Sequence, residues 1–140
     1  MTNRPSWNEY FIKMAEIAAS RSPDPNKQVG AILVSKNNRL LSQGYNGLPE
    51  KINESSVDWT NRPFIKKIII HAEINCLLYS QIIPPEGSKL YCTLSPCIEC
   101  LKVIKAYNID TVYFKEEYKH YHDVLEIASF FDLKLIKITS

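Results

Sequence analysis

The sequence of 140 residues predicts an α/β domain, in which a mostly parallel sheet of five strands carries helices on its faces. Two observations lead to this fold class. Short segments rich in Val, Ile, Leu and Tyr alternate with longer segments that have apolar residues at helical spacing. Pro, Gly and Asn lie between these segments, as is typical of turns. The predicted order of elements is α-β-β-α-β-α-β-α-β.

The first helix is predicted from a capping box, with Ser6 at the N-cap and Glu9 three residues later. The helix should end before Ser22-Pro23-Asp24-Pro25, because a residue that precedes proline avoids the α region. An apolar stripe at helical spacing is expected to face the core: Trp7, Tyr10, Phe11, Met14, Ile17 and Ala18.

A β-hairpin is predicted next, with strands at residues 28–35 and 39–44 and a turn at Lys36-Asn37-Asn38. The following residues, about 45–67, are polar, include Pro49 and Pro63, and have no clear period. We therefore expect a long loop there, and a loop of that length in a small domain is usually functional or disordered.

The second half of the chain alternates between helices and strands. A helix should follow His71 directly, and Ser95 at the N-cap with Pro96 at N1 predicts the start of the next one. The predicted elements are a helix at 72–80, a strand at 89–94, a helix at 96–107, a strand at 111–114, a helix at 121–131 and a strand at 133–138.

Composition limits the possible settings and partners. The net charge is only +2, so the chain does not resemble a dedicated nucleic-acid binder. There is no apolar N-terminal signal, and no segment approaches the roughly 20 apolar residues of a membrane span. We expect a cytoplasmic, reducing setting without a membrane partner, where a C-x-x-C motif indicates metal or redox chemistry.

Two short motifs predict a zinc site. His71-Ala72-Glu73 lies at one predicted helix start and Pro96-Cys97-Ile98-Glu99-Cys100 at the next. One imidazole and two thiols make three zinc ligands and leave a fourth position for water. A helix N-terminus lowers a thiol pKa and so favours the thiolate that binds metal. Taken singly, the cysteines fit a redox dithiol or buried apolar residues, and the histidine fits a core or cap position; the joint pattern is more specific.

Glu73 favours a catalytic zinc over a structural one. A structural site would be closed by a fourth Cys or His. Cys76 and Cys92 are the only other cysteines, and both are predicted to be buried free thiols. The sequence therefore predicts one zinc per subunit, with a carboxylate beside it as proton shuttle.

At these residues the chain resembles the cytidine deaminase-like superfamily, and more closely its deoxycytidylate (dCMP) deaminase branch. The resemblance runs through most of the chain: residues 6–11, 21–31, 71–75 and 94–100, and Gly44-Tyr45-Asn46-Gly47. It implies a three-layer α-β-α fold with a five-stranded mixed sheet and helices on both faces. Residues 1–140 would form a single zinc-dependent CMP/dCMP-type deaminase domain.

The resemblance implies hydrolytic deamination of dCMP to dUMP and ammonia, which supplies dUMP for thymidylate synthesis. His71, Cys97 and Cys100 would hold Zn²⁺, and Glu73 would be the catalytic residue that moves protons to N3 of cytosine and to the departing ammonia. The Ala72 backbone N–H would help to fix the pyrimidine.

Further substrate-binding residues are implied for the sugar and the phosphate. Asn46 would contact the deoxyribose, although Asn-Gly is also a common turn pair. Ser22, Asn26 and Lys27 are the candidates for the phosphate, and Lys27 fits a solvated loop charge nearly as well. Tyr118 and the adjacent Lys119 follow the fourth strand, where ligands bind in open α/β sheets.

The resemblance also implies assembly and regulation. Related enzymes form homo-oligomers, often hexamers, and the region after Gly-Tyr-Asn-Gly is associated with allosteric control by dCTP and dTTP with Mg²⁺. The family often has a further glycine there, whereas this chain has Leu48-Pro49-Glu50-Lys51-Ile52-Asn53. Allosteric control is therefore left open.

Three other functions fit parts of the pattern. A dCTP deaminase, or an enzyme that uses both dCMP and dCTP, would differ only in its phosphate pocket. A tRNA adenosine deaminase shares the zinc motifs but needs a basic surface, and we interpret the clusters at Lys66-Lys67 and 102–105 as solvated faces. A non-enzymatic module stapled by zinc would have no use for Glu73.

Overall fold

A computed structural model describes residues 3–139 and contains one mixed sheet of five strands in the order β2-β1-β3-β4-β5. Strand β1 runs antiparallel to both of its neighbours, whereas β3, β4 and β5 are parallel. The predicted mixed sheet is confirmed. The strands are β1 (Gly30–Val34), β2 (Leu40–Tyr45), β3 (Lys89–Leu94), β4 (Thr111–Glu116) and β5 (Lys134–Lys137).

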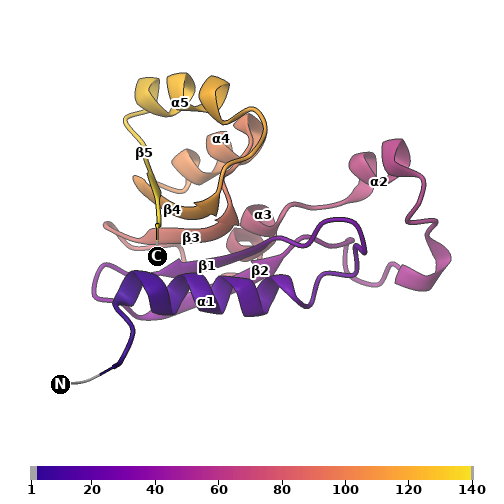
Figure 1. Cartoon of the computed structure of the whole chain (residues 1–140), viewed down its shortest axis with the longest axis horizontal. Coiled ribbons are helices and arrows are strands. Elements are labelled where there is room, and N and C mark those ends of the chain that lie inside the picture. The colour runs from indigo at the N-terminus through magenta and orange to yellow at the C-terminus, as the bar shows by residue number, and fades with distance from the viewer. Residues whose placement is uncertain (1–2, 140) are drawn as a thin grey trace.

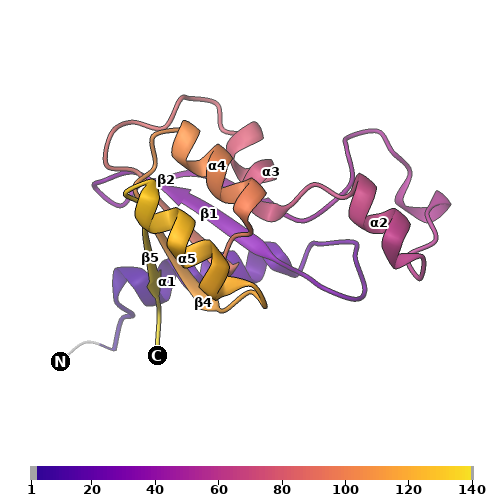
Figure 2. The same ribbon diagram turned by 90° about the horizontal axis from the view of Figure 1, so that it is seen from above.

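Helices cover both faces of this sheet, so the predicted three layers are confirmed (Figures 1 and 2). Helix α1 (Trp7–Ala19) packs on one face. Helices α3 (Ala72–Leu78), α4 (Ile98–Ala106) and α5 (Tyr121–Phe130) lie on the other. Within residues 3–139, no helix combines the length and the apolar character needed to cross a bilayer.

Alternating strand residues supply the two cores. Ile32, Val34 and Tyr91 point toward α1 and form one buried cluster with it. Leu33 and Leu90, which point the other way, belong to the cluster beneath α3, α4 and α5. This period of two is what a strand buried on both faces requires.

The start of α1 matches the prediction, but its buried face does not. The Ser6 hydroxyl accepts a hydrogen bond from the Glu9 N–H, and the Glu9 carboxylate accepts one from the Ser6 N–H, which completes the capping box. Of the predicted stripe, Phe11 and Ala18 are buried, whereas Trp7, Tyr10 and Ile17 are largely exposed.

The alanines of α1 face the sheet because its backbone lies against Gly30. A Cβ at Gly30 would overlap the carbonyl oxygen of Ala15 and lie 2.6 Å from the N atom of Ala19. Only a face with small residues at the point of contact allows this approach, so Ala15 is completely buried, and the rings of Trp7 and Tyr10 turn outward while that of Phe11 packs in the core.

An arm, which we define as residues 48–69, extends from the sheet (Figure 1). Its base is closed by a two-residue bridge, in which the N–H groups of Gly47 and Ile70 donate to each other's carbonyl oxygens at 3.0 and 2.8 Å. The arm contains a 3-10 turn, η1 (Glu54–Ser56), and helix α2 (Arg62–Ile68).

The prediction of a loop without helix was wrong for α2. The Asn61 side chain accepts a hydrogen bond from the Phe64 N–H, and Pro63 lies in the first turn. An Asn followed by Pro at this spacing is a start signal for a helix. The helix has only seven residues, which is too short for its apolar period to stand out.

Helix α4 also begins later than predicted. Its N-cap is Cys97, in an extended conformation (φ −78°, ψ 172°), and not Ser95. The Ser95 hydroxyl instead accepts a hydrogen bond of 2.7 Å from the backbone N–H of Tyr118. This contact ties the end of β3 to the segment after β4 and leaves the thiol of Cys97 at the helix start.

Helix α3 lies with its backbone directly on β2. A Cβ at Gly44 would overlap the backbone N atom of Cys76 and lie 2.7 Å from the carbonyl oxygen of Ala72. Glycine at this position therefore fixes how closely the helix approaches the strand.

We predict that Gly44→Ala lowers the free energy of unfolding by about 1–3 kcal/mol, because both contacting groups are backbone atoms that cannot rotate away. Chemical denaturation measures this change. The matched control is Gly47→Ala, whose new Cβ would meet only side-chain atoms at 3.7 Å or more and should change stability by less than about 0.5 kcal/mol. Equal stability of the two variants would contradict the packing described.

Candidate active site

A cavity of about 580 Å³ opens at one edge of the sheet. Asn46 follows β2, Ser95 follows β3, Tyr118 follows β4 and Val29 precedes β1, and all four line the cavity. Since β1 is antiparallel to its neighbours, these positions meet at the same edge. The carboxyl ends of strands are where open α/β sheets bind ligands.

Three potential metal ligands meet at this cavity. The Nδ1 atom of His71 lies 3.1 Å from the Sγ atom of Cys100 and 3.5 Å from that of Cys97. All three ligand atoms lie within 4.8 Å of one another. His71 is the N-cap of α3 and Cys97 the N-cap of α4, and neither side chain caps its own helix. Both side chains are therefore directed to the shared point.

The spacing of these atoms fits a zinc ion. With ordinary Zn–N and Zn–S bond lengths, a tetrahedral site places a nitrogen and a sulfur ligand about 3.6 Å apart. The observed separations of 3.1 and 3.5 Å lie close to that value. One imidazole with two thiols is also a donor set that zinc accepts at catalytic sites.

The cluster favours a thiolate. The hydrogen bond from the Cys100 thiol, supported by His71, lowers the pKa of Cys97 to about 4. The same pairing raises the pKa of Cys100. The hydrogen bond to Cys97 raises the pKa of His71, so the imidazolium and the thiolate stabilise each other. The thiolate is the form of cysteine that binds metal.

Glu73 lies beside this cluster and lines the same cavity. Its side chain is only 4% exposed. Burial raises the pKa of Glu73, and attraction to His71 offsets only part of this effect. A carboxyl group whose pKa is raised is a better proton acceptor than an ordinary carboxylate, as a general base must be, and can return the proton as a general acid.

The remaining cysteines match their predicted role. Cys76 and Cys92 are free and completely buried, and neither belongs to the ligand cluster. Burial raises the pKa of Cys76 to about 12, so this thiol stays protonated and unreactive.

Five of the six residues predicted to contact substrate line the cavity: Asn26, Lys27, Asn46, Ala72 and Tyr118. Ser22 is the exception. It is buried, and its hydroxyl donates to the carbonyl oxygen of Asn46 at 2.8 Å and accepts from the N–H of Asp24 at 3.3 Å. Its contacts therefore hold the loop together.

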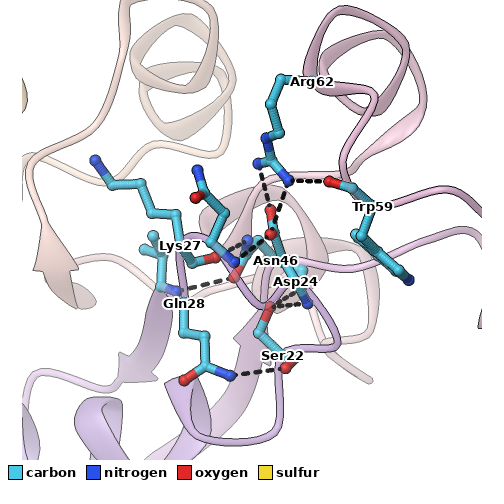
Figure 3. Close-up of polar contacts among 9 residues, drawn as sticks. Ser22, Asp24, Lys27, Gln28, Asn46, Trp59 and Arg62 are labelled. Carbon is cyan, nitrogen blue, oxygen red and sulfur yellow. Dashed lines mark hydrogen bonds and ion pairs between the residues drawn. The ribbon is translucent and has the colours of Figure 1, made fainter.

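Asn46 holds the same loop from the side of β2 (Figure 3). Its Oδ1 atom accepts a hydrogen bond from the Val29 N–H, and its Nδ2 group donates to the carbonyl oxygen of Lys27, both at 2.8 Å. The loop before β1 is thus fixed relative to the end of β2.

Three charged residues of the cavity were missed in the sequence: Asp24, Arg62 and Lys66. Lys66 was interpreted as part of a solvated face, but it lines the cavity because α2 brings it there. The helix start signal at Asn61 could have revealed α2. Arg62 and Lys66 are four residues apart, and such residues share a face of a helix.

Asp24 and Arg62 form an ion pair at the cavity. The side chain of Asp24 is 2% exposed and that of Arg62 30%. Burial alone raises the pKa of Asp24, but hydrogen bonds from Arg62 and from the backbone of Asn26 and Lys27 outweigh it, so the pKa is lowered overall.

A second cavity, of about 590 Å³, lies within the arm. Its walls are mostly apolar and include Leu48, Ile52 and Phe64. Among the residues that the structure describes, Asp58 is the only acidic one that lines this second cavity, and none of the cluster residues does. The cavity at the sheet edge is therefore the one equipped for chemistry.

An α/β sheet with three zinc-type ligands and a buried carboxylate beside them is typical of zinc-dependent hydrolases. Comparison with known proteins narrows this class. A profile of the cytidine and deoxycytidylate deaminase zinc-binding region matches residues 5–116. The chain belongs to this deaminase family.

Individual relatives point to one branch. Deoxycytidylate deaminase of Homo sapiens is 35% identical over 126 residues, which cover 84% of this chain and 67% of the human protein. Deoxycytidylate deaminase of Mycobacterium phage D29 is 34% identical over 128 residues, which cover 82% of this chain and 98% of the phage protein. The crystal structure of dCMP deaminase from cyanophage S-TIM5 in complex with dCMP and dUMP aligns with a TM-score of 0.75 at 28% identity, covering 98% of this chain and 100% of that one.

We predict that Asp24→Asn destabilises the chain in a pH-dependent way. Because the pKa of folded Asp24 lies below its ordinary value of 3.8, the ionised carboxylate stabilises the fold above that pH, and this stabilisation is lost as the pH falls through the folded pKa. The difference in free energy of unfolding between wild type and variant should be about 1–3 kcal/mol at pH 6. It should shrink when denaturation is repeated below pH 3.8.

The control is Asp110→Asn, which removes an exposed ion pair with Lys105. Such pairs contribute about 0–1 kcal/mol, so this variant should show little change at either pH. If the difference in free energy of unfolding between wild type and Asp24→Asn does not vary with pH, stabilisation by the ionised carboxylate is ruled out.

Proposed function

We propose that this chain catalyses the hydrolytic deamination of dCMP to dUMP and ammonia. The observation that carries the proposal is the content of one cavity: two residues of the metal-ligand cluster, the buried carboxyl of Glu73 and several lysines all line it. Deamination of a cytosine ring needs the metal ligands and the carboxyl group. Binding of a phosphate needs the lysines. The relatives named deoxycytidylate deaminase support the same substrate.

His71, Cys97 and Cys100 would hold the zinc ion. They supply three ligands, as catalytic zinc sites usually do. A zinc ion bound there supplies a Lewis acid that makes water a usable nucleophile near neutral pH.

Glu73 would be the catalytic residue that moves protons. Its carboxylate accepts a proton from the attacking water and passes it to N3 of the cytosine ring. A second proton, from the hydroxyl then attached at C4, goes through the same carboxyl to the departing amine. The C4–N bond breaks, a C4 carbonyl forms and ammonia leaves. A buried carboxyl with a raised pKa suits both directions of transfer.

Two groups would orient the base and sugar. Ala72 is the first residue of α3, where a backbone N–H has no acceptor within its own helix. This N–H would donate to the pyrimidine. Asn46 carries two amide hydrogens, of which the carbonyl oxygen of Lys27 accepts one. The other would donate to the deoxyribose, and Tyr118 would close the cavity from the side of β4.

The phosphate would be bound by the outer part of the cavity. Asn26 and Lys27 line it from the loop before β1, Lys66 from α2 and Lys119 from the segment after β4. Among the described residues, none of these three lysines lies within 4.0 Å of a carboxylate oxygen, so their charges are available to an anion. Ser22 would contribute indirectly, through its hydrogen bond to Asn46.

The same lysines favour a second candidate. Three cations could bind more than one phosphate, so dCTP, alone or beside dCMP, is the alternative substrate. The chemistry at the base would be unchanged.

We further propose that residues 1–140 act as one domain in the cytoplasm and assemble as a homo-oligomer, with a hexamer favoured. The absence of disulfides among the described cysteines supports a reducing setting. Exposed apolar side chains such as Ile83 and Phe130 support association.

Allosteric control by dCTP and dTTP with Mg²⁺ is a proposal of the same kind. The family's extra glycine is missing, but Lys51 has a φ of 74°, the left-handed conformation that glycine favours. The Ile52 N–H donates to the Pro49 carbonyl oxygen across this residue, so the turn is formed without glycine.

The central test is an assay of ammonia release with cytidine, dCMP, dCTP and an RNA loop that bears the tRNA adenosine. We expect turnover of dCMP, and Glu73→Gln should reduce kcat by about 10²–10⁴-fold while the fold and the bound zinc remain, because only the proton carrier is lost. No turnover of any cytosine nucleotide, with or without dCTP as activator, would refute the proposal. Full activity of Glu73→Gln would show that Glu73 is not the proton carrier, whereas a chain that binds zinc but deaminates none of these substrates would indicate a module in which zinc is structural.

We predict one zinc ion per chain in the purified protein. Cys97→Ser, Cys100→Ser and His71→Ala should each lose most of the bound metal, because two remaining ligands do not hold zinc tightly. Inductively coupled plasma mass spectrometry measures the content. Cys76→Ala is the control and should keep its zinc, since Cys76 lies outside the cluster. Loss of zinc from this control would mean that Cys76 completes a closed structural site.

A further inference from the structure

Arg62 and Asp24 connect the arm to the loop before β1 (Figure 3). The Nη1 group of Arg62 donates to Oδ1 of Asp24 at 3.0 Å, and its Nη2 group donates to Oδ2 at 2.8 Å. Nη1 also donates to the carbonyl oxygen of Trp59 at 3.0 Å. Two parallel hydrogen bonds fix the orientation of both partners, which a single contact would not.

The carboxylate of Asp24 also shapes its own loop. Its Oδ1 atom accepts a hydrogen bond of 2.8 Å from the N–H of Asn26, and the N–H of Lys27 interacts with it as well. On its other side the loop is held by Asn46, which accepts from Val29 and donates to the carbonyl oxygen of Lys27. The backbone of Lys27 is thus fixed between Asp24 and Asn46, while its side chain lines the cavity.

Arg62 itself has little capacity left for a ligand. Both hydrogens of Nη1 and one of Nη2 are used by Asp24 and Trp59. Its charge is balanced by Asp24, which within residues 3–139 is the only carboxylate besides Glu73 that lines the cavity. Lys66, one turn further along α2, lines the same cavity, and no carboxylate of the described residues forms an ion pair with it.

On the basis of the function proposed above, we propose that Arg62 is a positioning residue for recognition of the substrate's phosphate. It holds Asp24, and Asp24 holds the turn that presents Asn26 and Lys27 to an anionic group. The same contact holds α2, from which Lys66 lines the cavity. Selectivity for a nucleotide over its nucleoside would depend on this pair, although neither partner contacts the phosphate.

The test compares Arg62→Gln, Arg62→Lys, Asp24→Asn and the Arg62→Gln/Asp24→Asn double variant with wild type. We measure kcat and KM for dCMP, and the inhibition constants of dUMP and deoxyuridine, which differ only by the phosphate. Arg62→Gln should raise KM for dCMP and the inhibition constant of dUMP by about 10- to 100-fold, as expected for a lost charge-assisted contact. The constant for deoxyuridine and kcat should change by less than about threefold, because the base and the zinc site are untouched.

The other variants separate positioning from direct binding. Asp24→Asn removes a negative charge from the cavity, so simple electrostatics predicts tighter dUMP, whereas positioning predicts a loss like that of Arg62→Gln. Arg62→Lys keeps the charge without the two-pronged contact and should resemble Arg62→Gln. The double variant should bind dUMP no more weakly than the weaker-binding of the two single variants, because both substitutions disrupt the same contact. Lys67→Gln, which removes an exposed charge next to Lys66 on α2, is the control and should behave as wild type.

Zinc content and thermal unfolding of each variant establish that the site is intact. If Arg62→Gln does not fold, Arg62→Lys replaces it in the comparison. The inference would be overturned if Arg62→Gln and Asp24→Asn deaminate dCMP as well as the wild type does and discriminate between dUMP and deoxyuridine to the same extent. The proposed function would then still stand. Tighter dUMP binding by Asp24→Asn would also overturn the inference. A wild-type chain that does not deaminate dCMP would refute the proposed function and this inference with it.

Discussion

The contact between the backbone of α3 and strand β2 determines where the site can form. Gly44 has no Cβ, so the first and second turns of α3 lie directly on the strand. That contact sets the position of His71, Ala72 and Glu73 at the start of the helix. Strand β3 ends at the same edge and delivers Cys97 to the start of α4. The starts of α3 and α4 meet because Gly44 allows α3 to lie close to β2.

The acidic and basic groups of the cavity lie at different depths. Glu73 is almost completely buried beside the ligand cluster, where loss of water raises its pKa. Lysines line the outer part, and the other carboxylate that the described residues place at the cavity, Asp24, is neutralised by Arg62. A substrate with an uncharged, polar base and an anionic tail matches this order.

Features that depend on neighbouring residues could be predicted from the sequence. The capping box at Ser6, the hairpin and the alternation of helices and strands are local, and the P-C-x-x-C and H-x-E motifs carry their chemistry in adjacent residues. Most strand boundaries agree within two residues for the same reason.

Features that depend on tertiary contacts could not be predicted in this way. Ser95 looked like an N-cap, but a backbone N–H 23 residues away uses its hydroxyl. The buried face of α1 is chosen by Gly30 and not by the size of its aromatic residues. Arg62 and Lys66 join the cavity only through a seven-residue helix at the end of a polar arm. In each case the deciding partner lies far away in the sequence.

The Asp24–Arg62 pair has a consequence for the order of assembly. Its partners are 38 residues apart, and closing a flexible chain of that length costs roughly 3 kcal/mol of entropy. Each of the two charge-assisted hydrogen bonds of the pair contributes about 1.5–3 kcal/mol, so this entropy cost offsets a large part of what the pair contributes. Once β1 and β2 are joined and Asn46 holds Lys27, about half of that chain remains to be closed. Pairing of β1 with β2 therefore lowers the entropy cost of closing the lysine-lined mouth of the cavity.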